Sequence, residues 1–197
     1  MIRSILIAAL GAAALTGCAL LSSPEPAQLY RFGGQVQAQP AGAQSVEVSL
    51  RRIDFPEAVR GDRILGVTGT EAAYIAGARW VSPADALYTD ALHAAFAGAQ
   101  RVRLIGARDL AREQLALDIN VTTFEARYDA PGAAPTAVVA ATVTLVRLPS
   151  RELLASERFI VSQLAGENRV SAIVAAFDVA TRDLNTQLVG WTDGVAR

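Results

Sequence analysis

A single thiol offers the most distinctive chemistry in this sequence. Cys18 is the only cysteine among 197 residues, so the chain holds no second thiol for a disulfide, a thiolate metal site or a redox pair. Its sulfur is a nucleophile that can be acylated, and a small residue before it lets an extended backbone enter a peptidase site. The residues that would form such a recognition site are Leu15, Thr16 and Gly17.

The segment before these residues has the features of an export signal. Met1 and Arg3 provide a positive start, and residues 5–14 form an uncharged apolar run. This run is too short to cross a bilayer, which takes about 20 apolar residues, but it suits the apolar region of a signal peptide. The pattern resembles the lipobox of bacterial lipoproteins. An ordinary secretory signal with a chance cysteine is the alternative.

The lipobox resemblance implies a defined set of modifications. A diacylglyceryl group would be attached to Cys18, the peptide bond before it would be cleaved, and the new amine would receive a further acyl chain such as palmitate. Two or more chains anchor a protein stably, whereas one chain holds it reversibly. In the sorting system that this signal resembles, Asp after the cysteine favours the inner membrane. The residue after Cys18 is Ala19, so we expect the protein at the periplasmic face of the outer membrane rather than at the inner membrane.

Length and composition predict one domain behind this anchor. We expect a signal peptide over residues 1–17, a lipidated tether over 18–27 and a single domain over 28–194. Hydrophobic residues make up 52% of the chain, enough for a sizeable core. Loss of Arg3 with the signal leaves 17 arginines against 19 acidic residues. This balance argues against a nucleic-acid partner, which would require a basic excess.

The remaining titratable residues do not form a recognisable catalytic motif. His93 is the only histidine, and we expect it on the surface of a helix or partly buried in it. The most prominent carboxylates are Asp118, Glu125, Glu152 and Glu157. Two of them could pair for glycoside hydrolysis, but alternation with apolar neighbours favours a solvated sheet face. We therefore predict no catalytic residues, no metal site and no cofactor other than the covalent lipid.

Arg79 and Trp80 are the residues most suggestive of a protein contact. Tryptophan and arginine are enriched among the anchors of interfaces, so this pair is the candidate partner interface. A tryptophan that leads into a helix also often covers a core, and that alternative stays open.

The pattern of apolar residues predicts more strands than helices. A period of two, β-branched composition or a short apolar run indicates a strand. The expected strands are 29–32, 45–53, 63–68, 72–81, 102–105, 115–128, 136–148 and 153–163. The strands at 63–68 and 72–81 should form a hairpin, and the last three should form an antiparallel meander.

Two helices are expected, one ending at Gly98 and one following Asn168. Ser82 should cap the first helix, with Asp85 reaching back as a capping box. Because the helices do not alternate with the strands, the fold class is α+β. We expect a mainly antiparallel or mixed sheet with both helices packed on one face.

The arrangement as a whole resembles the ABC-type transport auxiliary lipoprotein family, which accompanies MCE-type lipid transporters. The order and spacing of its weak motifs carry the resemblance, which spans nearly the whole mature chain. The motifs are Leu29-Tyr30-Arg31-Phe32, Val46-Glu47-Val48, Tyr74–Trp80, Ser82-Pro83 and Leu115–Phe124. The sequence departs from the family pattern after Ile53, where Asp54-Phe55-Pro56-Glu57 replaces the usual Leu-Pro-x-Tyr-Leu stretch.

The resemblance implies a non-catalytic docking subunit of a system that moves lipids or hydrophobic solutes between the membranes. Its partners would be an MCE-domain protein and, indirectly, an ABC permease and ATPase, with self-association into a homo-oligomer left open. Two other readings remain. One is a partner of an outer-membrane assembly or translocon, of the lipopolysaccharide or secretin type. The other is a periplasmic hydrolase that uses the dispersed carboxylates.

Overall fold

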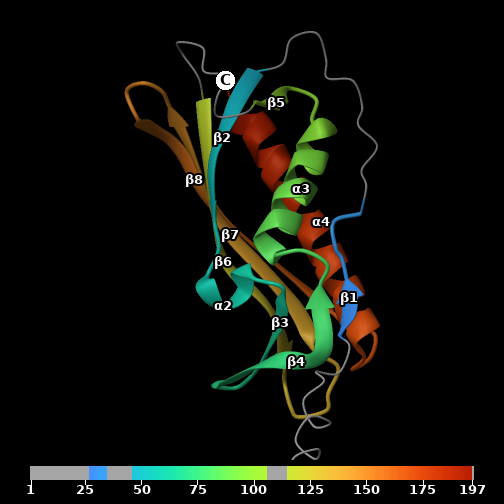
Figure 1. Ribbon diagram of the computed structural model, residues 1–197. Coiled ribbons are helices and arrows are strands. Elements are labelled where there is room, and N and C mark those ends of the chain that lie inside the picture. The colour runs from blue at the N-terminus through green and yellow to red at the C-terminus, as the bar shows by residue number, and fades with distance from the viewer. Residues whose placement is uncertain (1–26, 35–45, 106–114, 197) are drawn as a thin grey trace, which may run out of the picture.

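The computed structural model describes residues 27–34, 46–105 and 115–196. Within them, the strands form one mixed sheet, and the two long helices lie on one face of it (Figure 1). The strands are β1 (Gln28–Tyr30), β2 (Val46–Asp54), β3 (Arg63–Thr68), β4 (Glu71–Trp80), β5 (Val102–Ile105), β6 (Leu115–Tyr128), β7 (Thr136–Arg147) and β8 (Glu152–Leu164). The helices are α2 (Glu57–Arg60), α3 (Ala84–Ala97) and α4 (Val170–Val195). This arrangement confirms the α+β class.

Strand β6 lies at the centre of the sheet. The strand order is β1-β4-β3-β6-β2-β5, with β7 between β6 and β8. The pairs β3–β4, β6–β7 and β7–β8 are antiparallel, which confirms the predicted hairpin and meander. The pairs β1–β4, β2–β5, β2–β6 and β3–β6 are parallel. Parallel neighbours need a crossover connection, and the segment containing α3 lies between β2 and β5.

Local sequence accounts for the long strands of the meander. Val138, Val139 and Val143 are β-branched residues that fit a pleated surface. Residues 137–141 of β7 are all buried, on both faces of the strand. Three of these five residues are alanines, at positions 137, 140 and 141, whose small side chains allow close approach of the neighbouring elements.

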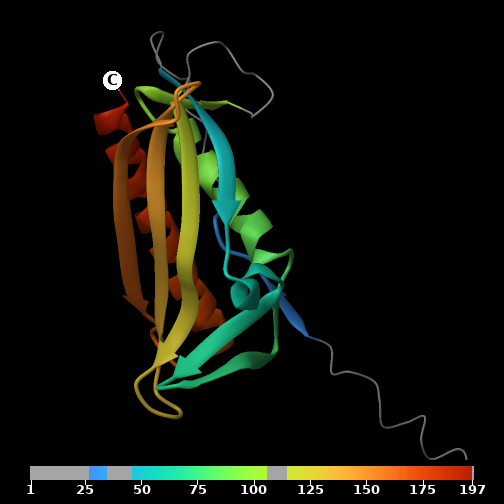
Figure 2. The ribbon, with the colours of Figure 1, turned by 90° about the vertical axis from the view of Figure 1, so that its left-hand side faces the viewer.

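Helices α3 and α4 lie side by side on the same face of the sheet, as Figure 2 shows from the opposite face. Helix α4 contacts β7 and β8, and α3 contacts β2 and β5. Below them is a cluster of aromatic rings formed by Phe32, Trp80, Phe124 and Phe177, with neighbouring centroids 4.8–5.6 Å apart along it. The cluster joins the turn after β1, the sheet and α4 into one core.

Two details of the helices differ from the prediction. Ser82 does not cap α3: the residue before the helix is Pro83, without a side-chain hydrogen bond. Asp85 accepts a bond from the adjacent Ala86 N–H instead of reaching back, while the Ala84 N–H donates to the Gly61 carbonyl. The short helix α2 was not predicted, because four residues carry no periodicity that a sequence pattern could reveal.

Candidate functional site

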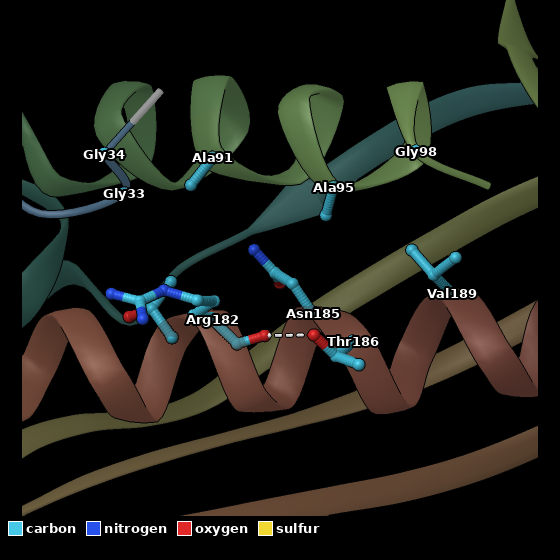
Figure 3. Close-up of a pocket in the computed structure, with 10 residues that line it drawn as sticks. Gly33, Gly34, Ala91, Ala95, Gly98, Arg182, Asn185, Thr186 and Val189 are labelled. Carbon is cyan, nitrogen blue, oxygen red and sulfur yellow. Dashed lines mark hydrogen bonds between the residues drawn. The ribbon is translucent and has the colours of Figure 1, made fainter. Parts of the chain in front are cut away.

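A hollow lies between α3 and α4 and has a volume of about 350 Å³. We call it the α3–α4 slot (Figure 3). Its walls are Ala91 and Ala95 on α3, Gly98 directly after α3, and Arg182, Asn185 and Val189 on α4, with Gly33 and Gly34 at one end. The volume falls in the range of ligand pockets, about 300–1,000 Å³. The slot is therefore large enough for a small molecule or part of a larger one.

Small residues keep the slot open on the α3 side. Ala91, Ala95 and Gly98 follow one another at helical spacings of four and three, so they share one face of α3. None of them carries a side chain long enough to cross to α4. The gap is consequently built into the sequence of α3.

The turn after β1 closes one end of the slot and requires glycine. Gly33 has a φ of 72°, a left-handed conformation that glycine adopts without strain. A Cβ at this position would lie 2.5 Å from the Cβ of Ala91. Glycine therefore allows both the turn and its close approach to α3.

Asp178 fixes this turn to α4. Its Oδ1 accepts a hydrogen bond from the Gly33 N–H at 2.8 Å and a longer one from the Gly34 N–H at 3.4 Å. Its Oδ2 pairs with Arg182, one helical turn later. The charge of Arg182 at the mouth of the slot is thereby balanced.

Two buried polar side chains lie in α4 at the floor of the slot. Thr181 is fully buried and Asn185 is 1% exposed. Neither Thr181 Oγ1 nor Asn185 Oδ1 has a hydrogen-bond partner among the described residues. Figure 3 shows Asn185 projecting from α4 towards α3. The neighbouring Thr186 hydroxyl, by contrast, donates to the Arg182 carbonyl at 2.8 Å.

The residues that line the slot are suited to binding a ligand. Its lining contains no nucleophile beside a general base. Across the described ranges, no group of three or more His, Cys, Asp or Glu side chains is arranged to hold a metal ion. The slot offers hydrogen bonds from a hydroxyl and an amide within mostly apolar walls.

The predicted lipidation site, Cys18, lies outside the described residues, as do Leu15, Thr16 and Gly17. Arg79 is exposed and makes two hydrogen bonds from Nη1 to the Asp62 carboxylate, at 2.9 and 3.0 Å.

Trp80 corrects one part of the sequence-based interpretation. Its side chain is 2% exposed and lies against Phe32 and Phe177 in the aromatic core. It therefore does not form part of the surface that a partner could contact, and the core alternative describes it. The two neighbours point to opposite faces of β4, as alternation along a strand requires, which leaves Arg79 alone at the surface.

The other candidate residues lie apart from the slot. His93 is on the exposed side of α3. Asp118 forms an ion pair with Arg51, whose Nε lies 2.9 Å from Oδ1, and this hydrogen bond raises the pKa of Arg51. Glu125 pairs with Arg127. These carboxylates are engaged in salt bridges, and the structure does not bring them together as an acid–base pair.

The slot was missed because its signal is weak in sequence. Thr181 and Asn185 interrupt the apolar face that Phe177, Leu184 and Leu188 define in α4. Polar residues spaced by four on a buried face are the only local trace of such a site. The small residues opposite them lie about 90 positions earlier in the chain, on α3.

The fold and the slot together define a class: a small α+β domain with helices on one face of its sheet and a site suited to binding. The chain belongs to the ABC-type transport auxiliary lipoprotein component family, whose model matches residues 30–189. It is thus an auxiliary lipoprotein component of an ABC-type transport system. In the part of the chain described, no helix combines the length and apolarity needed to cross a membrane.

Solved structures of similar proteins share the fold. Protein XCC0632 of Xanthomonas campestris, described under the family model DUF330, is 24% identical, with a TM-score of 0.72 over 85% of this chain and 96% of that one. An uncharacterized protein is 17% identical, with a TM-score of 0.64 over 85% and 99%. Hypothetical protein CT253 of Chlamydia trachomatis is 10% identical, with a TM-score of 0.52 over 77% and 98%. No curated protein sequence matches the chain significantly.

Proposed function

We propose that this protein is the lipid-anchored docking subunit of a system that moves lipids or hydrophobic solutes between the two bacterial membranes. The observation that carries the proposal is the family match over residues 30–189. The role is non-catalytic. Its direct partner is an MCE-domain protein that bridges the periplasm, and the ABC permease and ATPase are reached through that protein.

The anchor limits where the domain can work. Acyl chains on Cys18 hold the mature N-terminus at the periplasmic face of the outer membrane. Ala27, the first described residue, is nine positions after Cys18. A fully extended chain spans at most about 3.6 Å per residue, so Ala27, just before β1, lies within about 32 Å of the anchored residue. Leu29 on β1 is an exposed apolar residue, as is Val81, whose N–H donates to the Tyr30 carbonyl beside it.

Strand β8 is the surface that we assign to the protein partner. It is paired only with β7 among the described strands, so its outer edge presents backbone N–H and C=O groups. Leu153, Ile160 and Leu164 on this strand are 54–62% exposed. An edge of 13 residues with apolar side chains is suited to β-strand addition by another chain. Arg79 provides an additional polar contact at the other side of the sheet.

Co-purification tests the proposal. The full-length protein, extracted from membranes in a gentle detergent and captured through a C-terminal tag, should bring with it the MCE-domain protein, the permease and the ATPase. Recovery of a β-barrel of the lipopolysaccharide or secretin type in their place would support the translocon alternative. Recovery of the lipoprotein without the transport subunits would contradict the proposed role. The same sample on a sizing column determines whether the protein self-associates.

A further inference from the structure

The face of β1 and β4 that points away from the aromatic core carries arginines beside exposed apolar side chains. Leu29 is the register partner of Arg79 across β1 and β4, and Arg79 is in turn the partner of Arg63 on β3. Paired residues share one face of a sheet, so these three side chains form a row. Together with the exposed residues Arg31 and Val81, we call them the β1–β3 surface.

An open hollow of about 230 Å³ lies in this surface and is lined by Ala27, Tyr74, Arg63 and Arg79. Among the described residues that line it there is no carboxylate. The Arg63 guanidinium carbon lies 3.7 Å from the centroid of the Tyr74 ring, and the Tyr74 hydroxyl donates to the Ala58 carbonyl at 3.1 Å. A guanidinium stacked in this way keeps its N–H groups available to an anion.

Two arginines of the surface keep their charge. Arg79 is paired with Asp62, but Arg31 and Arg63 form no ion pair within the described part of the chain. On its other side Arg63 lines a second hollow with Asp85, where the remaining acidic residue is paired with an arginine of its own. Three arginines therefore stand against two carboxylates, and the surface is cationic.

The tether indicates what covers this surface. Ala27 lines the hollow and is nine positions after Cys18, so an anchored chain leads directly to it. Anionic lipids attract basic residues that lie within a Debye length of a membrane, and exposed apolar side chains add to such binding. Because a tether raises the effective concentration of the domain at the bilayer, a weak attraction is enough to hold it there.

We propose that the β1–β3 surface lies against the anionic headgroup layer of the bilayer that holds the anchor. Arg31 and Arg63 contact lipid phosphates, and Leu29 and Val81 enter the interface. This inference rests on the proposed anchor at Cys18 and deepens it, since it names the side of the domain that meets the membrane. Strand β8 lies at the opposite edge of the sheet and stays open to a protein partner.

Nitroxide quenching tests the contact with the bilayer. Leu29→Cys introduces a thiol that can carry the dye NBD, because the sulfur of Cys18 is acylated in the lipidated protein. The full-length protein is reconstituted in nanodiscs of phosphatidylcholine, with or without phosphatidylglycerol, in which some phosphatidylcholine carries a nitroxide on its acyl chain. Quenching should be several-fold stronger with phosphatidylglycerol. Equal quenching in the two compositions, or none in either, would overturn the proposal.

Leu153→Cys provides the matched control. Leu153 is 61% exposed and lies beside the β7–β8 turn, at the opposite end of the sheet from the β3–β4 hairpin (Figure 2). A dye at this position should stay unquenched in both compositions. Equal quenching at the two positions would refute the proposed orientation. So would a blue shift of the dye at position 29 without quenching, because it would indicate contact with a protein.

Charge variants test the two arginines. Arg31→Gln and Arg63→Gln should each lower the ratio of docked to undocked domain about fivefold, which corresponds to about 1 kcal/mol per basic residue near an anionic membrane. Arg158→Gln removes the same charge from an exposed position on β8 and should have no effect. Arg63→Lys should retain most of the docking, and an unchanged Tm excludes misfolding. Wild-type docking of both glutamine variants, or an equal loss with Arg158→Gln, would contradict the assignment.

Co-purification of the transport subunits is measured on the same preparations. If those subunits are recovered but the dye at position 29 is not quenched, the surface proposal fails and the proposed function stands. If the dye is quenched but the subunits are not recovered, the proposed function fails and the surface proposal stands.

Discussion

Gly33 shows how much one residue can determine at the α3–α4 slot. It combines a left-handed φ with close contact to Ala91, and its N–H is held by Asp178. The turn, the start of the slot and the attachment to α4 therefore depend on the same backbone atoms.

Gly33→Ala should destabilise the protein by at least about 1–2 kcal/mol, the cost of a left-handed non-glycine residue, with the contact to Ala91 adding to it. Gly34→Ala is the matched control, since a Cβ there meets nothing within 4 Å. Urea denaturation of both variants measures the difference in free energy of unfolding. Equal stability of the two variants would contradict the role of Gly33.

Tyr88 should make the stability depend on alkaline pH. Its side chain is fully buried, and burial raises the pKa of its phenol above the usual value of about 10. The unfolded chain releases this proton first, so the stabilising contribution is complete below about pH 10 and is lost as the pH rises. The loss is about 1.4 kcal/mol per pH unit until the folded-state pKa is reached.

Tyr88→Phe should remove this dependence. The other ionisable groups are common to both proteins, so the difference between their urea denaturation curves from neutral pH to above pH 10 isolates Tyr88. At neutral pH the variant should be at least as stable, because the Tyr88 hydroxyl has no hydrogen-bond partner among the described residues. Parallel pH profiles would refute the explanation.

At the scale of elements, β8 and the helix pair have opposite properties. The helices face each other across a slot whose polar groups are buried, while β8 presents apolar side chains and an unpaired edge to solvent. We therefore propose that β8, rather than the helix pair, offers the surface for a protein partner.

Ile160→Glu places a charge on β8 where the wild-type side chain is 54% exposed. The stability should change by less than about 0.5 kcal/mol, as for most surface substitutions, but the recovery of transport subunits in the co-purification should fall. Gln187→Glu adds the same charge on the exposed side of α4 and serves as the control. Undiminished recovery with Ile160→Glu would exclude this part of β8 from the docking surface.

Periodicity predicted the elements well because it reports local geometry. The bounds of β3, β5 and β6 agree with the prediction, and the buried face of α3 includes Leu87, Tyr88 and Leu92. A mixed sheet was allowed for, but the particular parallel pairs were not predicted, because partners such as Val48 and Leu115 are far apart in sequence and no local signal links them. The slot was not predicted for the same reason, because its two walls, α3 and α4, are far apart in sequence and meet only in the folded protein.

Capping and burial show where local signals were misleading. Ser82 has the right residue type for a cap, yet the Ala84 N–H is bound by the Gly61 carbonyl, so a tertiary contact replaces the side chain. Trp80 has the composition of an interface anchor, but strand alternation directs it into the core. In both cases the surrounding fold, and not residue type, determined the outcome.

At the scale of the whole molecule, we expect the lipid anchor to determine where the protein is located without affecting how its domain folds. Cys18→Ser removes the thiol that acylation requires, so the protein should leave the membrane fraction, and complementation of a deletion strain should be lost. The domain fold should persist, because Cys18 precedes every described residue. Fractionation, circular dichroism of the variant and growth assays measure these three outcomes. A variant that still fractionated with membranes and complemented fully would contradict the anchoring model.

The central position of β6 has a consequence for export. Strands β2 and β3 are not paired with each other. Both pair with the same edge of β6, β2 along residues 115–120 and β3 along residues 126–128, while β7 occupies the other edge. A chain that crosses the inner membrane from its N-terminus delivers β1 to β5 before Leu115 emerges. During that interval β2 with β5 forms one group of paired strands and β1 with the β3–β4 hairpin forms another, and no strand joins the two groups. The two groups of strands can therefore join into one sheet only after β6 has been translocated.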